Sequence, residues 1–198
     1  MSNDSRKDRT KLQLRDAMIQ LLGEKSFDQI STTELVKLAK VSRSSFYTHY
    51  QDKYDMIEAY QRRLFETIQY VFEKNNGNIH ATMLETFEFL KGNQIYAALL
   101  SENGSKEIHQ FMLQKLKELI QSSFFPQSKH LKLGKLGEIY ATTYYANAIF
   151  GTTQSWIRRK QKETPTQIAN LLVELINLKN GSFRRIVFYH SILENNSH

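Results

Sequence analysis

Cysteine is absent from this sequence of 198 residues, which excludes disulfide bonds, thiolate-bound zinc and a thiol nucleophile. Only two prolines and eight glycines are present, and so few helix-breaking residues favour long helices over a turn-rich β-sandwich. No apolar run approaches the ~20 residues that a membrane-spanning helix needs, and the first residues lack the apolar core of a signal peptide. We therefore expect a soluble, cytoplasmic protein.

Motifs of catalysis and of metal binding are missing as well. The six histidines never lie three or four residues apart, so no two of them share a helical face as zinc ligands do. Glycine-rich phosphate-binding loops and the nucleophile motif G-x-S-x-G are also absent from the sequence. We expect a protein that is not an enzyme and that holds no metal and no cofactor.

Basic side chains are in excess, because 27 Lys and Arg residues face 20 Asp and Glu residues and give a net charge of +7. Such a charge favours phosphate-rich partners, but it is unevenly distributed. Residues 1–60 carry 10 basic and 9 acidic side chains, whereas residues 61–198 carry 17 and 11. A nucleic acid held by the N-terminal part would therefore be bound through a local patch and not through bulk charge.

Apolar residues recur at helical spacing along most of the chain, and no alternating pattern is long enough to build a sheet. The first helix carries Leu14, Met18 and Leu22 on one side, and Thr10 with Gln13 form a possible capping box at its start. Further helices are expected at about residues 31–39, 42–50, 52–74, 83–92, 108–125, 131–160 and 164–179. The conformation of the tail, residues 182–198, stays open between helix, strand and extended arm.

Two helix starts have a clear chemical signature. Ser31 with Glu34, and Thr164 with Gln167, have the spacing of a capping box, in which each side chain satisfies the other residue's backbone N–H. Pro165 also suits the first helical position, where no backbone donor is needed. These pairs predict helices that begin after residues 31 and 164.

Three short helices within residues 10–50 have helix-turn-helix proportions. Leu35, Val41 and Phe46 can join these helices through apolar side chains, which leaves polar side chains free to face outward. Hydroxyls, an arginine and a histidine can donate to phosphate oxygens or reach base edges in a major groove about 12 Å wide. The candidate DNA contacts of this kind are Thr33, Arg43, Ser44, Ser45, Tyr47, Thr48 and His49. Lys53 opens the next helix, where its charge and the free N–H groups can meet one phosphate.

This stretch resembles the helix-turn-helix signature of the tetracycline-repressor (TetR) family, from Leu14 to about Ile57 and above all in ISTTELVKLAKVSRSSFYTHYQDKYDM. The matching positions are Val41-Ser42 in the turn, Ser45-Phe46-Tyr47 in the recognition helix, His49-Tyr50 at its end and Lys53 at the start of the fourth helix. Lys40 departs from the family, which most often has glycine in the turn. A left-handed backbone would cost lysine about 1 kcal/mol more than glycine there.

The resemblance implies an all-α fold, with a helix-turn-helix DNA-binding domain at residues 1–58 and a helical dimerisation and effector-binding domain at residues 59–198. The stretch from Tyr144 to Leu172 is similar to one subgroup of the family, whose last two major helices pair with those of a second subunit. The interface residues expected on this basis are Ile149, Gly151, Trp156, Leu172 and Ile176.

Aromatic residues in the second half of the chain can form a largely apolar effector pocket, although each of them alone suits an ordinary core. The candidates are Phe87, Tyr96, Phe111, Tyr144 and Tyr145.

The resemblance thus implies a DNA-binding transcriptional regulator, most often a repressor, that binds a palindromic double-stranded DNA operator as a homodimer and is released by a small-molecule effector. Two other interpretations stay open at this point. One is a TetR-like co-activator or adaptor whose C-terminal domain binds another protein. The other is a charge-driven binder of RNA or of membrane surfaces, with sequence-independent affinity and a steep salt dependence.

Overall fold

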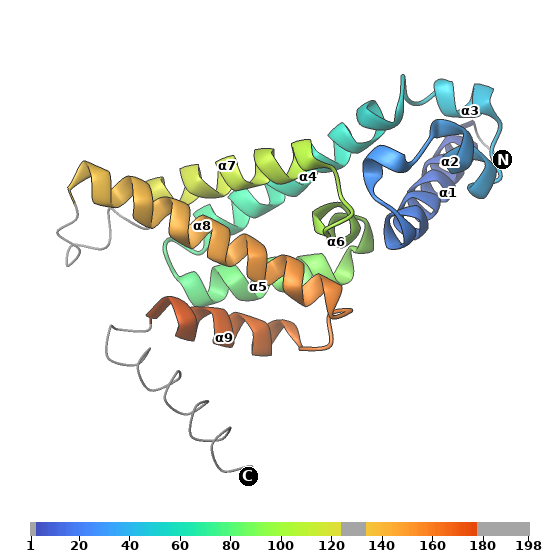
Figure 1. Cartoon of the computed structure of the whole chain (residues 1–198). Helices are drawn as coiled ribbons and strands as arrows, with labels where there is room; N and C mark the ends of the chain where they lie inside the picture. The colour runs from blue at the N-terminus through green and yellow to red at the C-terminus, as the bar shows by residue number, and fades with distance from the viewer. Residues whose placement is uncertain (1–2, 124–133, 178–198) are drawn as a thin grey trace, which may run out of the picture.

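The computed structural model of the chain describes residues 3–123 and 134–177, and every regular element within those ranges is helical (Figure 1). The elements are α1 (Asn3–Glu24), the 3-10 helix η1 (Phe27–Gln29), α2 (Thr32–Leu38), α3 (Arg43–Tyr47), α4 (Lys53–Lys74), α5 (Ile79–Gly92), α6 (Gln94–Leu100), α7 (Lys106–Ser123), α8 (Lys135–Arg158) and α9 (Pro165–Asn177). The expected all-α fold is confirmed. The tail at residues 182–198 lies outside the described ranges.

Side chains fix two of the helix starts as predicted. At the start of α2, the Ser31 hydroxyl oxygen accepts from the N–H of Glu34 at 3.2 Å, and the Glu34 carboxylate accepts from the N–H of Ser31 at 3.1 Å. Thr164 and Gln167 form the same reciprocal pair before α9, at 3.2 and 2.8 Å. Both predicted capping boxes are confirmed, and each satisfies backbone donors that helix geometry leaves without partners.

Two parts of the fold differ from the prediction. The first helix begins at Asn3 and not at Thr10. The helix α6 is not predicted at all, because it carries no amphipathic stripe: Ile95, Tyr96 and Leu99, like most of their neighbours, are buried. A short helix that is enclosed on all sides has no polar face, and hydrophobic periodicity then has nothing to detect.

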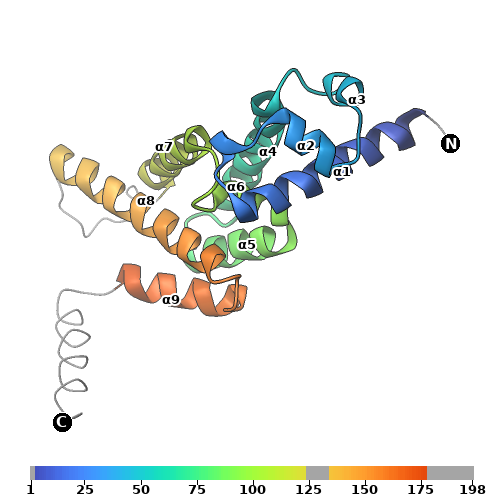
Figure 2. The same ribbon diagram turned by 45° about the vertical axis from the view of Figure 1, so that its right-hand side comes forward.

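The helices α1, α2 and α3 pack into a three-helix unit, in which α2 and α3 lie far from α9 in both views while α1 reaches α6 (Figures 1 and 2). Its core contains Leu14, Leu35 and Phe46, each with an exposed fraction of 0%. The 22-residue helix α4 starts beside this unit and continues into the body formed by α5 to α9. The expected domain boundary at residues 58 and 59 falls inside α4.

The body is organised around two helix pairs, α5 with α9 and α7 with α8 (Figures 1 and 2). Trp156 of α8 connects the two pairs, because its ring packs edge-to-face on Phe87 of α5 with the ring centroids 5.0 Å apart. Its indole N–H donates to the backbone carbonyl of Glu163 at 3.0 Å, so the buried polar atom has a partner. Trp156 therefore anchors the fold of a single chain.

The turn between α2 and α3 passes through a left-handed residue. Lys40 has a φ of 55°, in the left-handed region that favours glycine. The N–H of Val41 donates back to the carbonyl of Val36 at 3.1 Å, which closes the end of α2 as in a Schellman motif. The left-handed conformation anticipated at this position is confirmed.

Replacing this lysine by glycine should stabilise the protein. We expect Lys40→Gly to raise the free energy of unfolding by about 1 kcal/mol, because glycine adopts a positive φ without steric cost. The matched control is Lys37→Gly, an exposed position inside α2, where glycine should lower it by about 1 kcal/mol. Urea unfolding followed by circular dichroism measures both, and a Lys40→Gly variant less stable than the parent would contradict the expectation.

Candidate nucleic-acid interface

The short helix α3 has one buried side and one exposed side. Phe46 is fully buried, and Tyr50 packs tilted against its ring at 5.7 Å. Tyr47 lies on the opposite side with 56% of its surface exposed, and its ring meets the edge of Phe46 at 5.4 Å. The aromatic core therefore holds Tyr47 in a defined orientation toward solvent.

The exposed side of α3 continues onto α2. The guanidinium of Arg43 donates to the hydroxyl oxygen of Thr33 at 2.6 Å, which joins the two helices across the turn. Ser44 and Thr48 lie on the same side and are exposed, although the Thr48 hydroxyl already donates to the carbonyl of Ser44 at 2.9 Å. Five of the predicted contacts thus form one surface: Thr33, Arg43, Ser44, Tyr47 and Thr48.

The two other predicted contacts on this helix-turn-helix are half-buried. Ser45 takes part in the start of α3, since its N–H donates to the Ser42 hydroxyl oxygen at 3.0 Å and its own hydroxyl oxygen accepts from Ser42 at 2.9 Å. His49 lies at the end of α3, where burial is the main cause that lowers its pKa and the nearby Lys11 and Lys7 lower it further. Its imidazole is therefore held toward the neutral form.

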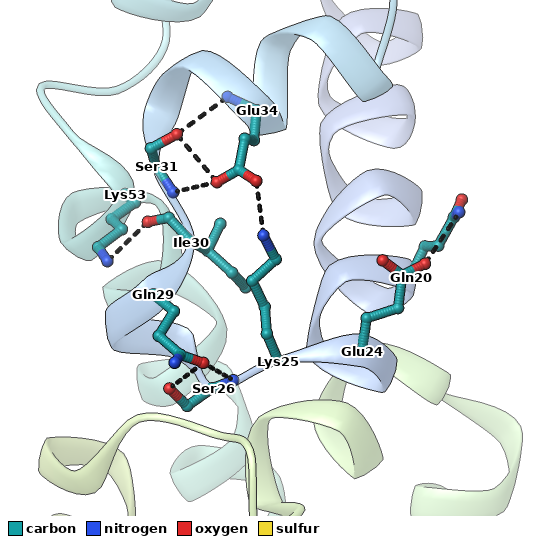
Figure 3. A network of polar contacts seen from close by, with 9 residues as sticks. All are labelled: Gln20, Glu24, Lys25, Ser26, Gln29, Ile30, Ser31, Glu34 and Lys53. Atoms are coloured by element: carbon teal, nitrogen blue, oxygen red, sulfur yellow. Dashed lines mark hydrogen bonds and ion pairs between the residues drawn. The ribbon is translucent and has the colours of Figure 1, made fainter.

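The expected phosphate contact of Lys53 needs correction. Its ammonium donates to three backbone carbonyls of one chain segment: Phe27 at 2.8 Å, Asp28 at 3.1 Å and Ile30 at 2.8 Å (Figure 3 draws the last of these). It also lies over the rings of Phe27 and Tyr54, 4.6 and 5.2 Å from their centroids. Because an ammonium has three donors and all are engaged, Lys53 fastens the start of α4 to η1 and does not reach toward a ligand.

A second polar connection fixes α1 relative to α2 (Figure 3). Lys25, just after α1, donates to the Glu34 carboxylate at 2.5 Å while the other carboxylate oxygen accepts from Ser31. The hydrogen bond from Lys25, followed by those from Ser31, lowers the pKa of Glu34 to about 2. The carboxylate is thus ionised at neutral pH and connects the helix cap to the preceding helix.

Two cations that the sequence analysis did not single out lie near the end of α3. Lys7 and Lys11 are one turn apart on α1, are exposed, and lie close enough to His49 to affect its pKa. The four basic residues at positions 6, 7, 9 and 11 were the available signal, but spacing alone does not show which helix end they approach. The structure brings Lys7 and Lys11 near His49, just after the end of α3.

The predicted pocket residues do not line one cavity. Phe87 lines an apolar cavity among α4, α5, α7 and α8, and Tyr145 lines a neighbouring one. Tyr96 is buried between the rings of Tyr60 and Phe89 outside the lining of these two cavities, and Phe111 packs on Phe65. Tyr144 is 65% exposed, because successive helical residues point about 100° apart and its neighbour Tyr145 faces inward.

The predicted interface residues also need correction. Trp156 and Leu172 are 1% and 2% exposed within the single chain, so neither can anchor a second subunit. Ile149 and Ile176 are half-buried beside the cavities, whereas Gly151 is exposed with open space around it. The exposed apolar residues lie on the other side of α8 and α9, and they are Leu136, Ile139, Tyr140, Tyr144, Leu171 and Leu175.

Neither a metal site nor a membrane span is found within residues 3–123 and 134–177. No group of three or more His, Asp or Glu side chains there could hold a metal ion. No described helix combines the length and apolarity of a membrane span.

A three-helix unit that presents an exposed short helix, joined through a long helix to a helical body, defines a helix-turn-helix regulator of transcription. The comparisons with known proteins specify the family. Residues 14–60 match the family described as "Bacterial regulatory proteins, tetR family", and residues 77–178 match "Transcriptional regulator C-terminal region". The chain belongs to the TetR family of DNA-binding transcriptional regulators.

Individual relatives are distant in sequence. The chain is 22% identical over 175 residues to the HTH-type transcriptional regulator YxbF of Bacillus subtilis, covering 84% of this chain and 44% of that protein. In structure it is similar to NalD, described as the secondary repressor of a multidrug efflux pump in Pseudomonas aeruginosa, with a TM-score of 0.64, 19% identity and 87% and 94% of the two chains covered. It is also similar to the dihydroxyacetone kinase operon activator DhaS, with a TM-score of 0.52, 21% identity and coverage of 85% and 92%.

Whether Lys53 has a structural role or contacts phosphate can be tested with nonspecific duplex DNA. Lys53→Met should lower the free energy of unfolding by about 2 kcal/mol, because three carbonyls lose a charged donor. The salt dependence of DNA binding should not change in this variant. Lys7→Met and Lys11→Met should leave stability unchanged and should each reduce the slope of log K against log salt by about 0.9.

Urea unfolding and fluorescence anisotropy at several salt concentrations provide these measurements. If Lys53→Met reduced the salt slope and left the stability intact, Lys53 would be a phosphate contact as the sequence analysis expected.

Proposed function

We propose that the protein is a cytoplasmic repressor that binds a palindromic operator as a homodimer and leaves it when a small molecule binds its body. The observation that carries the proposal is the exposed side of α3, where Arg43, Ser44 and Tyr47 face solvent while Phe46 is buried. In this proposal residues 1–58 read the DNA, and residues 59–198 dimerise and hold the effector.

The chemistry of the exposed side suits a major groove. The remaining guanidinium donors of Arg43 can bond guanine O6 and N7, and the hydroxyls of Ser44 and Tyr47 can donate to base edges or phosphates. Lys7 and Lys11 supply the sequence-independent attraction to the backbone that Lys53 does not provide. Base reading and phosphate binding are thereby divided between α3 and α1.

The exposed apolar stripe of α8 and α9 supports a homodimer. Tyr140 and Tyr144 are 68% and 65% exposed, and Leu171 and Leu175 of the neighbouring helix are 47% and 44% exposed. Large apolar side chains that gather in solvent on neighbouring helices mark a candidate interaction site. A second copy is the occupant that the DNA-binding side requires, because one helix-turn-helix makes few base contacts and two half-sites must be read together.

In this proposal the dimer has two arrangements of its subunits, one that fits the operator and one that does not. Release by an effector requires that the ligand bind these two arrangements with different affinity. The cavities among α4, α5, α7 and α8 support this part of the proposal, because α4 lines them and also begins at the DNA-binding unit. A ligand that moves α4 changes the distance between the two copies of α3 in a dimer.

The DNA-binding part is tested by selecting bound sequences from a random duplex library. We expect an enriched inverted repeat whose half-site centres lie about 34–36 Å apart, one turn of DNA. Tyr47→Ala should weaken binding to that sequence at least tenfold, because it removes a contact fixed by the core. The matched control is Tyr70→Ala, an equally exposed tyrosine (61%) on α4.

Binding should be unchanged in the control variant, and circular dichroism should show the same helix content in both. The assignment of α3 as the reading helix is refuted if Tyr47→Ala and Tyr70→Ala bind the selected DNA alike.

The dimer is tested with charge substitutions on the stripe. Tyr140→Glu and Leu171→Glu should produce monomers in sedimentation experiments, because burying an unpaired carboxylate at an interface costs several kcal/mol per ion. Operator binding should fall at least tenfold although α3 is untouched. Tyr70→Glu places the same charge on an exposed tyrosine of α4 and should remain dimeric.

A wild-type chain that sediments as a monomer at micromolar concentration would overturn the homodimer. The exposed apolar stripe would then be a binding surface for a different protein, as expected of a co-activator or adaptor.

A further inference from the structure

Two adjacent apolar cavities run through the body, and together they define the shape of a ligand. The first, of about 50 Å³, is lined from α4, α5, α7 and α8 and reaches Leu100 at the end of α6. The second, of about 40 Å³, continues toward Gly77 and Tyr145. Each is only a few water molecules in size, so a ligand must be narrow and the side chains around it must move to admit it.

The cavities are separated by three side chains that line both: Phe72, Met83 and Ile149. Methionine is the most adaptable of apolar side chains, because it has three rotatable bonds and no branch. A change of rotamer at Met83 can therefore join the two spaces into one elongated channel. A long unbranched chain fits such a channel better than a ring system does.

The polar atoms along the cavities are already engaged. The Thr86 hydroxyl donates to the carbonyl of Thr82 at 2.7 Å, and the Thr153 hydroxyl donates to that of Ile149 at 2.9 Å. Thr82 likewise donates to the carbonyl of Asn78 at 2.9 Å. These hydroxyls offer a ligand no donor, which favours a hydrocarbon over a ligand that carries polar groups along its length.

Lys115 is the one charged residue in the lining of either cavity. Its ammonium lies 5.1 Å from the centroid of Phe65 and donates to the Glu118 carboxylate at 2.9 Å. The side chain is 30% exposed, so its stem lines the cavity and its charge lies at the rim. A ligand carboxylate at this rim would meet the cation while its tail enters the cavity.

We infer that the effector is an unbranched fatty acid, with its carboxylate at Lys115 and its chain directed past Met83 toward Tyr145. This inference rests on the proposed effector-controlled function and names the chemical class of the effector. Phe65 and Phe111 flank the cation, with their ring centroids 5.1 and 5.9 Å from its nitrogen.

Binding can be followed without a label. The chain has one tryptophan, and Trp156 packs on Phe87, which lines the first cavity. Dodecanoate, titrated into the full chain below its micelle concentration, should change the tryptophan emission saturably. Dodecan-1-ol and dodecyltrimethylammonium should each bind at least tenfold more weakly, because neither headgroup carries the negative charge that pairs with Lys115.

Two variants locate the carboxylate. In Lys115→Met, dodecanoate should bind no better than dodecan-1-ol. In Lys117→Met, a control on the same helix whose residue is outside the lining of both cavities, the preference for the acid should persist. Equal binding of acid and alcohol by the wild type, or an unchanged preference in Lys115→Met, would overturn the inference.

A third variant tests the path of the ligand's hydrocarbon chain. Ile149→Phe enlarges the side chain between the two cavities, so it should weaken the binding of dodecanoate at least tenfold. The binding of hexanoate should be affected much less, because its shorter chain does not need to pass from the first cavity into the second. Met83→Ala should have the opposite effect on dodecanoate, and thermal unfolding confirms that both variants fold. Equal loss of both acids in Ile149→Phe, with the fold intact, would contradict a channel through both cavities.

Binding of the selected operator, measured with and without dodecanoate, separates this inference from the proposed function. If dodecanoate binds through Lys115 but does not release the operator, the ligand class holds and effector-controlled release fails. If dodecanoate does not bind while the protein still recognises its operator, the ligand class fails and DNA binding stands.

Discussion

The position of the DNA-binding unit depends on one half-buried cation. The ammonium of Lys53 bonds three carbonyls of the segment around η1, and Lys53 is also the first residue of α4. The start of the long helix is thereby fixed to the link between α1 and α2. Since α4 then runs along the cavities of the body, Lys53 connects the orientation of the three-helix unit to the helix that lines those cavities, together with the packing of α1 on α6.

Much of this fold could be predicted from the sequence, because helix starts and turns depend on interactions between residues that are close together in the chain. The capping boxes at Ser31 and Thr164 depend on residues three positions apart, and the structure contains both. The left-handed backbone of Lys40 is predictable in the same way, because the tight turn between α2 and α3 requires it. In contrast, α6 has no polar face, so a rule that detects amphipathic helices could not find it.

The sites were less predictable because they depend on which of two apolar faces a helix turns inward. α8 carries apolar residues on opposite sides, and spacing alone groups Trp156 with Ile149 without showing that both face the same chain's interior. The exposed side, with Tyr140 and Tyr144, is distinguished only by tertiary packing. The engagement of Lys53 likewise depends on carbonyls more than twenty residues away, which no local pattern encodes.

The turn between α6 and α7 has a consequence for the modularity of the chain. The Asn103 carbonyl accepts from the N–H of Phe27 at 2.7 Å, and its side-chain amide donates to the carbonyl of Leu22 at 2.8 Å. Gly104 is obligatory beside it, since a Cβ there would lie 1.9 Å from the Leu99 carbonyl oxygen. Two backbone groups of the three-helix unit therefore have their hydrogen-bond partners in the body. A chimaera that joins residues 1–58 to another regulator's body must bring an equivalent turn with it, or leave two backbone groups without their partners.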